Sequence, residues 1–264
     1  MKLIVPIKQV PESGAVKMDE TTGTVIRKDS DAVVNPLDLY AVECALRIRE
    51  KNGAECCALC MGPPNAEHAL REVLAMGMEE ALLVSDRAYA GSDTWATANI
   101  LAEAVRTFGP FDLILCGERA TDGDTGQVGP ELAAALGLPM AGYVTEIREI
   151  RNDSIRVVLM AEGGRQEAEL PLPALITVVK SIGEPRLPTL DGKMKARRMA
   201  IPKAGQGELK LAADQIGLAG SPTRVVKIFH PQLTRRCRLE FASDGKQIRR
   251  AVEQMNALIA ERNG

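Results

Sequence analysis

The sequence has few aromatic residues, little excess charge of either sign and no long apolar run. One Trp, three Tyr and four Phe among 264 residues argue against aromatic platforms on which single-stranded nucleic acids or sugars stack. A net charge of −2, from 33 basic and 35 acidic side chains, argues against a dedicated nucleic-acid-binding protein. No apolar segment approaches the roughly 20 residues of a membrane span, and residues 1–10 lack the pattern of a cleavable signal peptide. We therefore expect a cytoplasmic protein without a membrane span.

Recognisable catalytic or metal-binding machinery is also missing. The two histidines, His68 and His230, lie far apart and outside any His-Glu-x-x-His frame. Cys57 and Cys60 form a single Cys-x-x-Cys pair inside an apolar run, which favours burial in a core over metal binding. A cysteine-dependent or metal enzyme is the alternative, and it would require activity or metal to be lost when Cys57 or Cys60 is changed. The six cysteines are irregularly spaced, as expected where thiols stay reduced.

What the sequence does contain is a repeated alternation of short apolar strands and amphipathic helices. Residues 2–10 predict a buried first strand, and Asn35-Pro36 predicts a helix start, with Asn35 as the cap. Further strands are predicted at 54–61, 81–84 and 112–116, and further helices at 66–76, 94–108 and 129–136. This order predicts an α/β fold, with a parallel sheet flanked by helices on both faces. Strand-like segments at 144–150, 155–160, 167–170 and 175–179 predict a mainly antiparallel addition.

Two smaller features complete the outline. Alternating runs at 16–19 and 24–27 predict a hairpin between the first strand and the first helix. After residue 180 the chain is rich in breakers, and we expect a linker or exposed loop that includes the basic run 193–198. Helices are then predicted at 209–216 and 244–259. So little apolar periodicity predicts that this tail packs on another chain.

Three loops are candidates for a binding site, because ligands of an open parallel sheet bind at the carboxyl ends of its strands. They comprise residues 6–9, 61–64 and 117–130. The third resembles a phosphate cradle, since its four glycines allow close backbone approach, although neither G-x-G-x-x-G nor a Walker A sequence is present. Asp122 and Asp124 would repel a phosphate, so we assign them to ribose hydroxyls, loop hydrogen bonds or capping, with Asp124 and Gln127 at capping-box spacing. The alternative is a strand-to-helix turn that binds nothing.

A series of ordered motifs resembles the beta subunit of electron-transfer flavoprotein. They span nearly the whole chain: residues 5–11 (VPIKQVP), 35–38 (NPLD), 61–64 (MGPP), 75–77 (AMG), 117–130, 184–186 (EPR), 194–197 (MKAR) and 220–223 (GSPT). The resemblance implies a heterodimer with an alpha subunit that carries a flavin. It further implies an electron-carrier subunit whose redox chemistry is borne by the flavin, with no catalytic side chain of its own and no metal.

The resemblance also implies a second adenine nucleotide, held by the α/β domain of this chain. Ordinary members hold AMP there and bifurcating members hold FAD; the loop at 122–130 (DGDTGQVGP) is similar to the FAD-binding branch. The contacts carried over from the family are Pro6, Asn35, Pro36, Leu37, Asp38, Met61, Gly117, Glu118, Arg119, Ala120, Thr121, Asp122, Gly123, Asp124, Thr125, Gly126, Gln127 and Val128. Residues 1–190 are then the nucleotide-binding domain, and residues 191–264 are the end of a docking loop and an extended C-terminal arm on the partner subunit.

A docking site for a flavin dehydrogenase, such as an acyl-CoA dehydrogenase, is implied as well. Leu190 matches the family's anchoring leucine, with Lys195, Arg197 and Arg198 around it. The resemblance implies that this chain, with the alpha subunit, shuttles electrons between such a dehydrogenase and a redox acceptor or donor. The similarity to the FAD-binding branch further implies that the transfer can occur by flavin-based bifurcation. A stand-alone adenine-nucleotide-binding regulatory module is the alternative, which would be compact without a partner.

Overall fold

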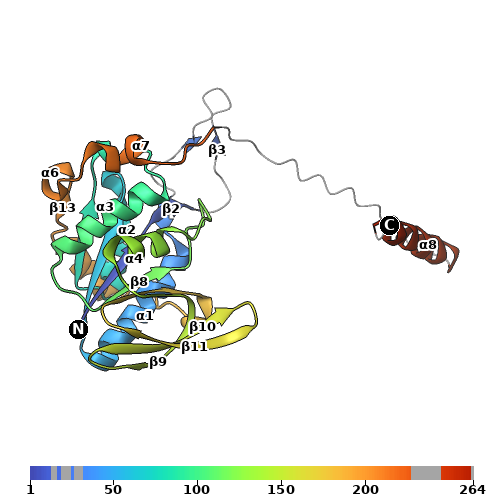
Figure 1. The fold of residues 1–264 in the computed structure, drawn as a ribbon, viewed down its shortest axis with the longest axis horizontal. Coiled ribbons are helices and arrows are strands. Elements are labelled where there is room, and N and C mark those ends of the chain that lie inside the picture. Colours follow the sequence, from blue (N-terminus) through green and yellow to red (C-terminus); the bar gives the residue numbers. More distant parts are fainter. Residues whose placement is uncertain (13–16, 19–24, 27–31, 227–244, 263–264) are drawn as a thin grey trace. The chain divides into compact units, whose positions relative to one another are not determined.

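The structure is a computed structural model that describes residues 1–12, 17–18, 25–26, 32–226 and 245–262. Its contacts divide the chain into two compact units, Met1–Val225 and Val226–Gly264. The first unit is the body, built around one sheet with helices on either side (Figure 1). The second unit contains a single described helix, and we treat it by itself.

The body contains a nine-stranded sheet in the order β11-β10-β9-β12-β8-β1-β6-β7-β13. Its strands, in chain order, are β1 (Lys2–Ile7), β6 (Glu55–Met61), β7 (Glu80–Val84), β8 (Leu113–Gly117), β9 (Met140–Ile150), β10 (Ser154–Ala161), β11 (Gly164–Pro171), β12 (Ala174–Val178) and β13 (Lys203–Ala204). The seven strands β9, β12, β8, β1, β6, β7 and β13, taken in this spatial order, are each parallel to their neighbours. β10 is antiparallel to both of its neighbours, β9 and β11. The predicted α/β class with a parallel sheet is confirmed.

The antiparallel addition differs from the prediction in one strand. β9, β10 and β11 form an antiparallel meander, but β12 returns to lie between β9 and β8 and is parallel to both. All five residues of β12 are buried, as expected for a central strand covered on both faces. Turn spacing alone suggested another hairpin strand, because it does not show where a buried strand re-enters the sheet.

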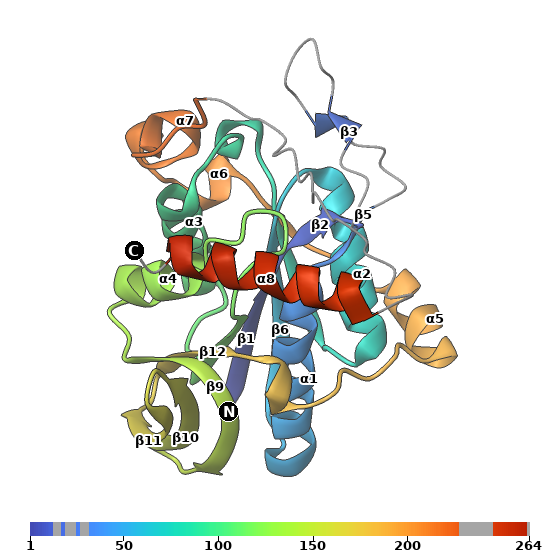
Figure 2. The same cartoon turned by 90° about the vertical axis from the view of Figure 1, so that its right-hand side faces the viewer.

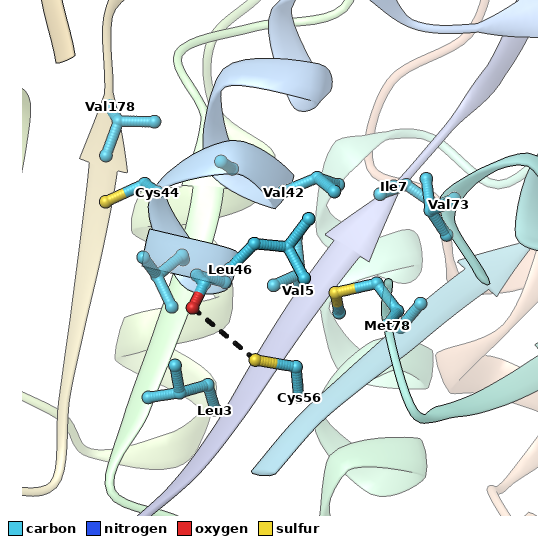
Figure 3. Packing of buried hydrophobic residues seen from close by; sticks show 14 of the residues in the cluster. Leu3, Val5, Ile7, Val42, Cys44, Leu46, Cys56, Val73, Met78 and Val178 are labelled. Carbon is cyan, nitrogen blue, oxygen red and sulfur yellow. Dashed lines mark hydrogen bonds between the residues drawn. The ribbon is translucent and has the colours of Figure 1, made fainter. Parts of the chain in front are cut away.

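Helices cover both faces of the sheet and divide the core into two clusters. α1 (Pro36–Asn52) and α2 (Glu67–Met76) pack on one face, and α3 (Thr94–Thr107) and α4 (Val128–Leu136) pack on the other. Because successive side chains of a strand point to opposite faces, Leu3 and Val5 of β1 join the first cluster and Ile4 joins the second. Figure 3 shows Leu3 and Val5 beneath α1, with the Cys56 Sγ donating to the Ala45 carbonyl at 3.5 Å.

The described residues between β1 and α1 form four short strands. β2 (Gln9–Pro11) pairs with β5 (Ala32–Val34), and β3 (Lys17–Met18) pairs with β4 (Val25–Ile26), each pair antiparallel. The β3–β4 pair confirms the predicted hairpin on its described residues, whereas residues 16, 19, 24 and 27 lie outside them. The predicted first strand is divided at Lys8, whose backbone carbonyl accepts a hydrogen bond from the backbone N–H of Asn35 at 2.8 Å.

The segment after residue 180 contains a helix where a loop was predicted. After the 3₁₀ turn η4 (Lys180–Ile182), α5 (Leu190–Arg198) forms with Thr189 as its N-cap, and Figure 2 shows it beside α2. Ala196 is only 2% exposed in the α1 and α2 cluster. The prediction of a loop for 193–198 was wrong because a single small apolar residue, among basic neighbours, anchors this helix.

The chain then continues across the body in short elements. They are α6 (Gln206–Leu209), η5 (Ala213–Gln215) and α7 (Gly217–Gly220). Two further 3₁₀ turns, η2 (Pro64–Ala66) and η3 (Arg87–Tyr89), precede α2 and α3 earlier in the chain. The predicted helix over 209–216 was wrong, since Lys210 takes a left-handed conformation with φ +52° that ends α6. Ala204, Leu209 and Ile216 are buried in the α3 and α4 cluster, so this part of the tail packs on its own chain.

The second unit contains α8 (Gly245–Arg262), which confirms the last predicted helix. Ile248, Val252 and Met255 are spaced along one face and are 53%, 50% and 61% exposed. The predicted fourth position, Ile259, has a side chain outside the described part of the structure. An apolar helix face with this exposure favours contact with another surface.

Candidate nucleotide-binding site

The three candidate loops meet at one edge of the sheet. They follow β1, β6 and β8, which are adjacent and parallel, so their carboxyl ends lie side by side. A hydrogen bond joins the first and third loops directly, since Lys8 Nζ donates to Asp122 Oδ1 at 2.7 Å. Gln9 Nε2 donates at 3.2 Å to the carbonyl of Asn65, which directly follows the second loop. The sheet topology thus brings together the residues that the sequence analysis singled out.

Asn35 fastens the first helix to the glycine-rich loop. Its side chain is fully buried; Nδ2 donates to the Arg119 carbonyl at 2.9 Å, and Oδ1 accepts from the Thr121 amide at 3.2 Å. Asn35 occupies the N-cap position of α1 but makes no side-chain capping bond, so the predicted capping role was wrong. The amide is used instead for the backbone of a loop that is distant in the sequence. Pro36 in the first turn confirms the predicted helix start.

Asp38 is a buried carboxyl group beneath the site. Its Oδ2 accepts from the Lys8 amide at 2.8 Å, and the residue is 8% exposed. Burial raises the pKa of Asp38 to about 7, although hydrogen bonds from the Lys8 amide and the Asn35 side chain, together with the Lys8 charge, oppose the shift. The carboxyl group therefore holds its proton more tightly than an exposed aspartate does, and in its protonated form it can donate as well as accept a hydrogen bond.

Gly117 is required by this close packing. A Cβ at Gly117 would lie 2.5 Å from Asp38 Oδ1 and 2.7 Å from the Leu37 carbonyl oxygen, both far inside van der Waals contact. The end of β8 and the start of α1 can approach this closely only because the side chain is absent.

The loop after Gly117 turns through two residues with positive φ. Asp124 has φ +54° and Gly126 has φ +64°. The Asp124 amide donates to the Ala120 carbonyl at 2.8 Å, and its carboxylate pairs with Arg119 Nε at 2.8 Å. The capping box predicted for Asp124 and Gln127 was wrong, because α4 begins after Gln127 without any side-chain capping bond.

Asp122 and Asp124 are therefore not free negative charges that would repel an anion at this site. Lys8 neutralises Asp122 and Arg119 neutralises Asp124, which agrees with the predicted role in loop hydrogen bonds. The N–H groups of the first turn of α4 have no partner within the helix. Together with the helix dipole, they make the start of α4 suitable for a phosphate group.

The glycines of this loop have different roles. Gly129 is buried, and a Cβ there would lie 2.8 Å from Thr177 Cγ2, so it lets α4 approach β12. Gly126 supplies positive φ, whereas a Cβ at Gly123 would meet open space. Packing against β12 thus requires Gly129, whereas the backbone conformation of the loop favours Gly126.

The remaining predicted contacts lie along the same edge with varied exposure. Pro6 is buried inside β1 opposite Leu59, so it contributes from the strand and not from the loop. The half-buried positions are Leu37, Met61, Glu118, Ala120 and Val128, and the exposed ones are Pro36, Arg119, Thr121, Asp122, Gly123, Asp124, Thr125 and Gln127. Gln127 also reaches the start of α3, where Thr94 Oγ1 lies 3.4 Å from its Oε1.

Two residues were not identified individually from the sequence. Lys8 lies in the first predicted loop and links Asp38 with Asp122. Its position directly after a buried strand was the available signal. Glu131, in the first turn of α4, accepts from Thr94 Oγ1 at 3.1 Å, and burial raises its pKa. Nothing in the sequence indicated the contact between the starts of α3 and α4.

The four predicted docking residues lie elsewhere, on α5. Leu190 is 76% exposed, and Lys195, Arg197 and Arg198 are exposed on the same helix. None of them belongs to the loop cluster at the edge of the sheet.

The Cys-x-x-Cys pair is placed as the core prediction expected. Cys57 and Cys60 are fully buried in β6, and burial raises the pKa of each thiol to about 12. Within the described residues no group of three or more His, Cys, Asp or Glu side chains could hold a metal ion. Thiols that stay protonated at neutral pH do not serve as nucleophiles.

Comparison with known proteins identifies the family. A family model described as the electron transfer flavoprotein domain matches residues 22–209. The chain belongs to the electron transfer flavoprotein family. Members of this family transfer electrons through a bound flavin. No helix in the described part of this member is long and apolar enough to cross a membrane.

Several relatives within the family match over most of their length. The electron transfer flavoprotein subunit beta of Thermoanaerobacterium thermosaccharolyticum is 39% identical over 97% of this chain and 98% of its own. The subunit of the same name from Megasphaera elsdenii is 43% identical, with 88% of each chain covered. The caffeyl-CoA reductase-Etf complex subunit CarD of Acetobacterium woodii is 41% identical, also with 88% of each covered.

Proposed function

We propose that this chain is the beta subunit of an electron transfer flavoprotein heterodimer in the cytoplasm, and that it holds an adenine nucleotide at the edge formed by β1, β6 and β8. The observation that carries the proposal is the convergence of three loops whose carboxylates are already paired. Asp122 and Asp124 are neutralised by Lys8 and Arg119, and the start of α4 beside them provides N–H groups for a phosphate.

The residues present fit such a group. A Cβ at Gly123 would meet open space, so the backbone of the loop is accessible there, and Asp38 can hydrogen-bond a hydroxyl or a ring nitrogen. Asn35 holds the loop in place. The flavin supplies the redox chemistry when it is bound. The chain's own residues bind and orient the nucleotide. No side chain acts as acid, base or nucleophile in this scheme.

FAD is the nucleotide that we assign to this site, with AMP as the alternative. The assignment is supported by the loop sequence at 122–130 and by the similarity to a subunit of the caffeyl-CoA reductase-Etf complex. We expect acid release and chromatography of the co-purified alpha and beta chains to give two FAD per heterodimer. One FAD with one AMP would establish the alternative, and a heterodimer with no nucleotide on this chain would contradict the proposed site.

The partner surfaces follow from the exposed apolar positions. The face of α8 with Ile248, Val252 and Met255 supports an arm that binds the alpha subunit, in preference to a stand-alone regulatory module. α5 is assigned to the docking of a flavin dehydrogenase such as an acyl-CoA dehydrogenase, with Leu190 as the apolar anchor and Lys195, Arg197 and Arg198 as its charged rim.

The Leu190→Ala variant tests the docking assignment. We expect KM for a reduced acyl-CoA dehydrogenase to rise about tenfold or more, because truncation of a central apolar anchor typically costs about 2 kcal/mol. Nucleotide content should not change, since Leu190 lies outside the loop cluster. Met160→Ala, which truncates another exposed apolar side chain on β10, is the matched control. Equal kinetics for the two variants would remove the docking assignment.

A further inference from the structure

Three apolar side chains, and not Leu190 alone, are exposed around the start of α5. Leu187 is 85% exposed, Leu190 is 76% exposed and Met194 is 48% exposed. Leu190 and Met194 are one helical turn apart, and Leu187 lies shortly before the helix. We refer to residues 187–198 as the docking segment. A contact surface of this kind binds well only if its side chains are held in place before the partner arrives.

The chain is held immediately before the docking segment by Arg186. Its Nε and backbone amide donate to Glu43 Oε2 at 2.8 and 3.1 Å, and its Nη2 donates to Glu43 Oε1 at 3.2 Å. The guanidinium also pairs with Glu50, further along α1, through both of its terminal nitrogens. Arg186 is thus bound to two glutamates of the same helix.

Glu43 is the centre of this cluster. Its side chain is 4% exposed, and Arg47 Nε donates to its Oε1 at 2.7 Å. Arg47 also donates to the Glu184 carbonyl at 3.3 Å, so two arginines hold residues 184–186 on α1. Although burial opposes it, the hydrogen bonds from Arg186 and Arg47 keep the pKa of Glu43 below its usual value. A buried carboxylate with this many donors is a fixed charge that specifies the position of its partner.

The other end of the docking segment is held on α2. Arg71 Nη1 donates to the Ala196 carbonyl at 2.6 Å and to the Met199 carbonyl at 3.4 Å, which caps the last turn of α5. In the middle, a Cβ at Gly192 would overlap the Ala75 carbonyl oxygen, so the helix backbone touches α2 directly. Figure 2 shows α5 beside α2, with the chain that leads to it running past α1.

We propose that Arg186 is a positioning residue: with Glu43 it fixes the path of the chain into α5, so that Leu187, Leu190 and Met194 present one preformed surface to an electron-transfer partner. This inference rests on the proposed docking role of α5. Without the Arg186 contacts, the backbone of residues 183–189 has more conformational freedom, and this freedom is lost when the electron-transfer partner binds. Ordering residues costs conformational entropy, so the loss appears in partner affinity. The packing of α5 on α2 does not depend on Arg186.

The experiment compares variants in the holo heterodimer, with an acyl-CoA dehydrogenase that reduces the wild type at a saturable rate. For Arg186→Ala we expect KM for the reduced dehydrogenase to rise about tenfold, equivalent to about 1.4 kcal/mol, with kcat changed less than about twofold. Glu43→Gln should give the same rise in KM with little change in kcat. The KM of the double variant should be no higher than that of either single variant, since the two side chains act as one unit. Arg186→Lys, which keeps the charge, should recover part of the loss.

The matched control is Arg106→Ala, which removes an arginine–glutamate pair with Glu103 on α3. Nucleotide content and chemical reduction of the flavin should stay at the wild-type level in every variant. If Leu190→Ala raises KM while Arg186→Ala and Glu43→Gln do not, the positioning role is wrong and the docking assignment stands. If none of the three changes KM, the docking assignment fails with it. A fall in kcat and nucleotide content together would show a merely structural role for the cluster and would also overturn the inference.

Discussion

Replacing Gly117 with alanine is expected to empty the nucleotide site and destabilise the body of the protein. The added Cβ would lie 2.5 Å from Asp38 Oδ1 and 2.7 Å from the Leu37 carbonyl oxygen. The first belongs to a buried carboxyl group held by the Lys8 amide and the second to the backbone, so neither can swing away. Relief requires the start of α1 to move away from β8. We expect a loss of roughly 2–4 kcal/mol, as for other overpacked or broken core contacts, and nucleotide occupancy below about a tenth of the wild-type level.

Gly123→Ala is the matched control for this substitution. It adds the same methyl group to the same loop, but the Cβ meets open space. Purification of both variants with the alpha subunit, followed by thermal unfolding and quantification of released nucleotide, separates the two outcomes. Full occupancy in Gly117→Ala would show that the contact between β8 and α1 can open at no cost to the site. Loss of nucleotide in both variants would indicate that the loop tip, and not the close approach, governs binding.

Asp38→Asn is expected to change the pH dependence of stability. Since the pKa of Asp38 is raised to about 7, the folded state binds its proton more tightly than the unfolded chain does. The stabilisation linked to that proton is fully present below the ordinary aspartate pKa of about 3.9 and is lost as the pH rises through about 7. Between pH 5 and pH 8.5 the wild type should lose roughly 2–3 kcal/mol through this group, at about 1.4 kcal/mol per pH unit below the pKa.

The side-chain amide that Asp38→Asn introduces cannot ionise, so that loss should be absent in the variant. Its oxygen can still accept from the Lys8 amide, which preserves the hydrogen bond that measures 2.8 Å in the wild type. The measurement is the difference in Tm between variant and wild type at pH 5, 7 and 8.5 in the holo heterodimer, and we expect it to shift in favour of the variant by several degrees as the pH rises. Asp153→Asn, in the exposed turn between β9 and β10, should show no such trend. Parallel curves for Asp38→Asn would exclude a raised pKa in the folded protein.

The predictions from the sequence were most successful where local pattern and topology act together. The strand–helix alternation predicted the parallel sheet, and the meeting of the three loops followed from the rule that ligand loops gather at the carboxyl ends of its strands. The predictions failed where a residue's partner is distant. Asn35 has the sequence context of a helix cap, yet it bonds the backbone at Arg119 and Thr121 because the loop carries unpaired polar groups at that point.

The same reason accounts for the other corrections. α5 has too few apolar residues to show a helical period, and its stability depends on Ala196, Gly192 and the capping by Arg71 from α2. β12 lies between β9 and β8 because its fully buried residues require a central position, which turn spacing does not reveal. In both cases the deciding contacts join segments that are far apart in the chain.

The α/β class, the three loops at one sheet edge and the family could all be predicted from the amino-acid sequence. Those features depend on periodicity and on short motifs, which are properties of neighbouring residues. Three features could be found only in the folded protein: the pairing of charges in the site, the glycines that packing requires, and the contacts by which Arg186 and Glu43 hold the chain before α5. These depend on distances between atoms of remote segments, which exist only once the sheet has brought those segments together.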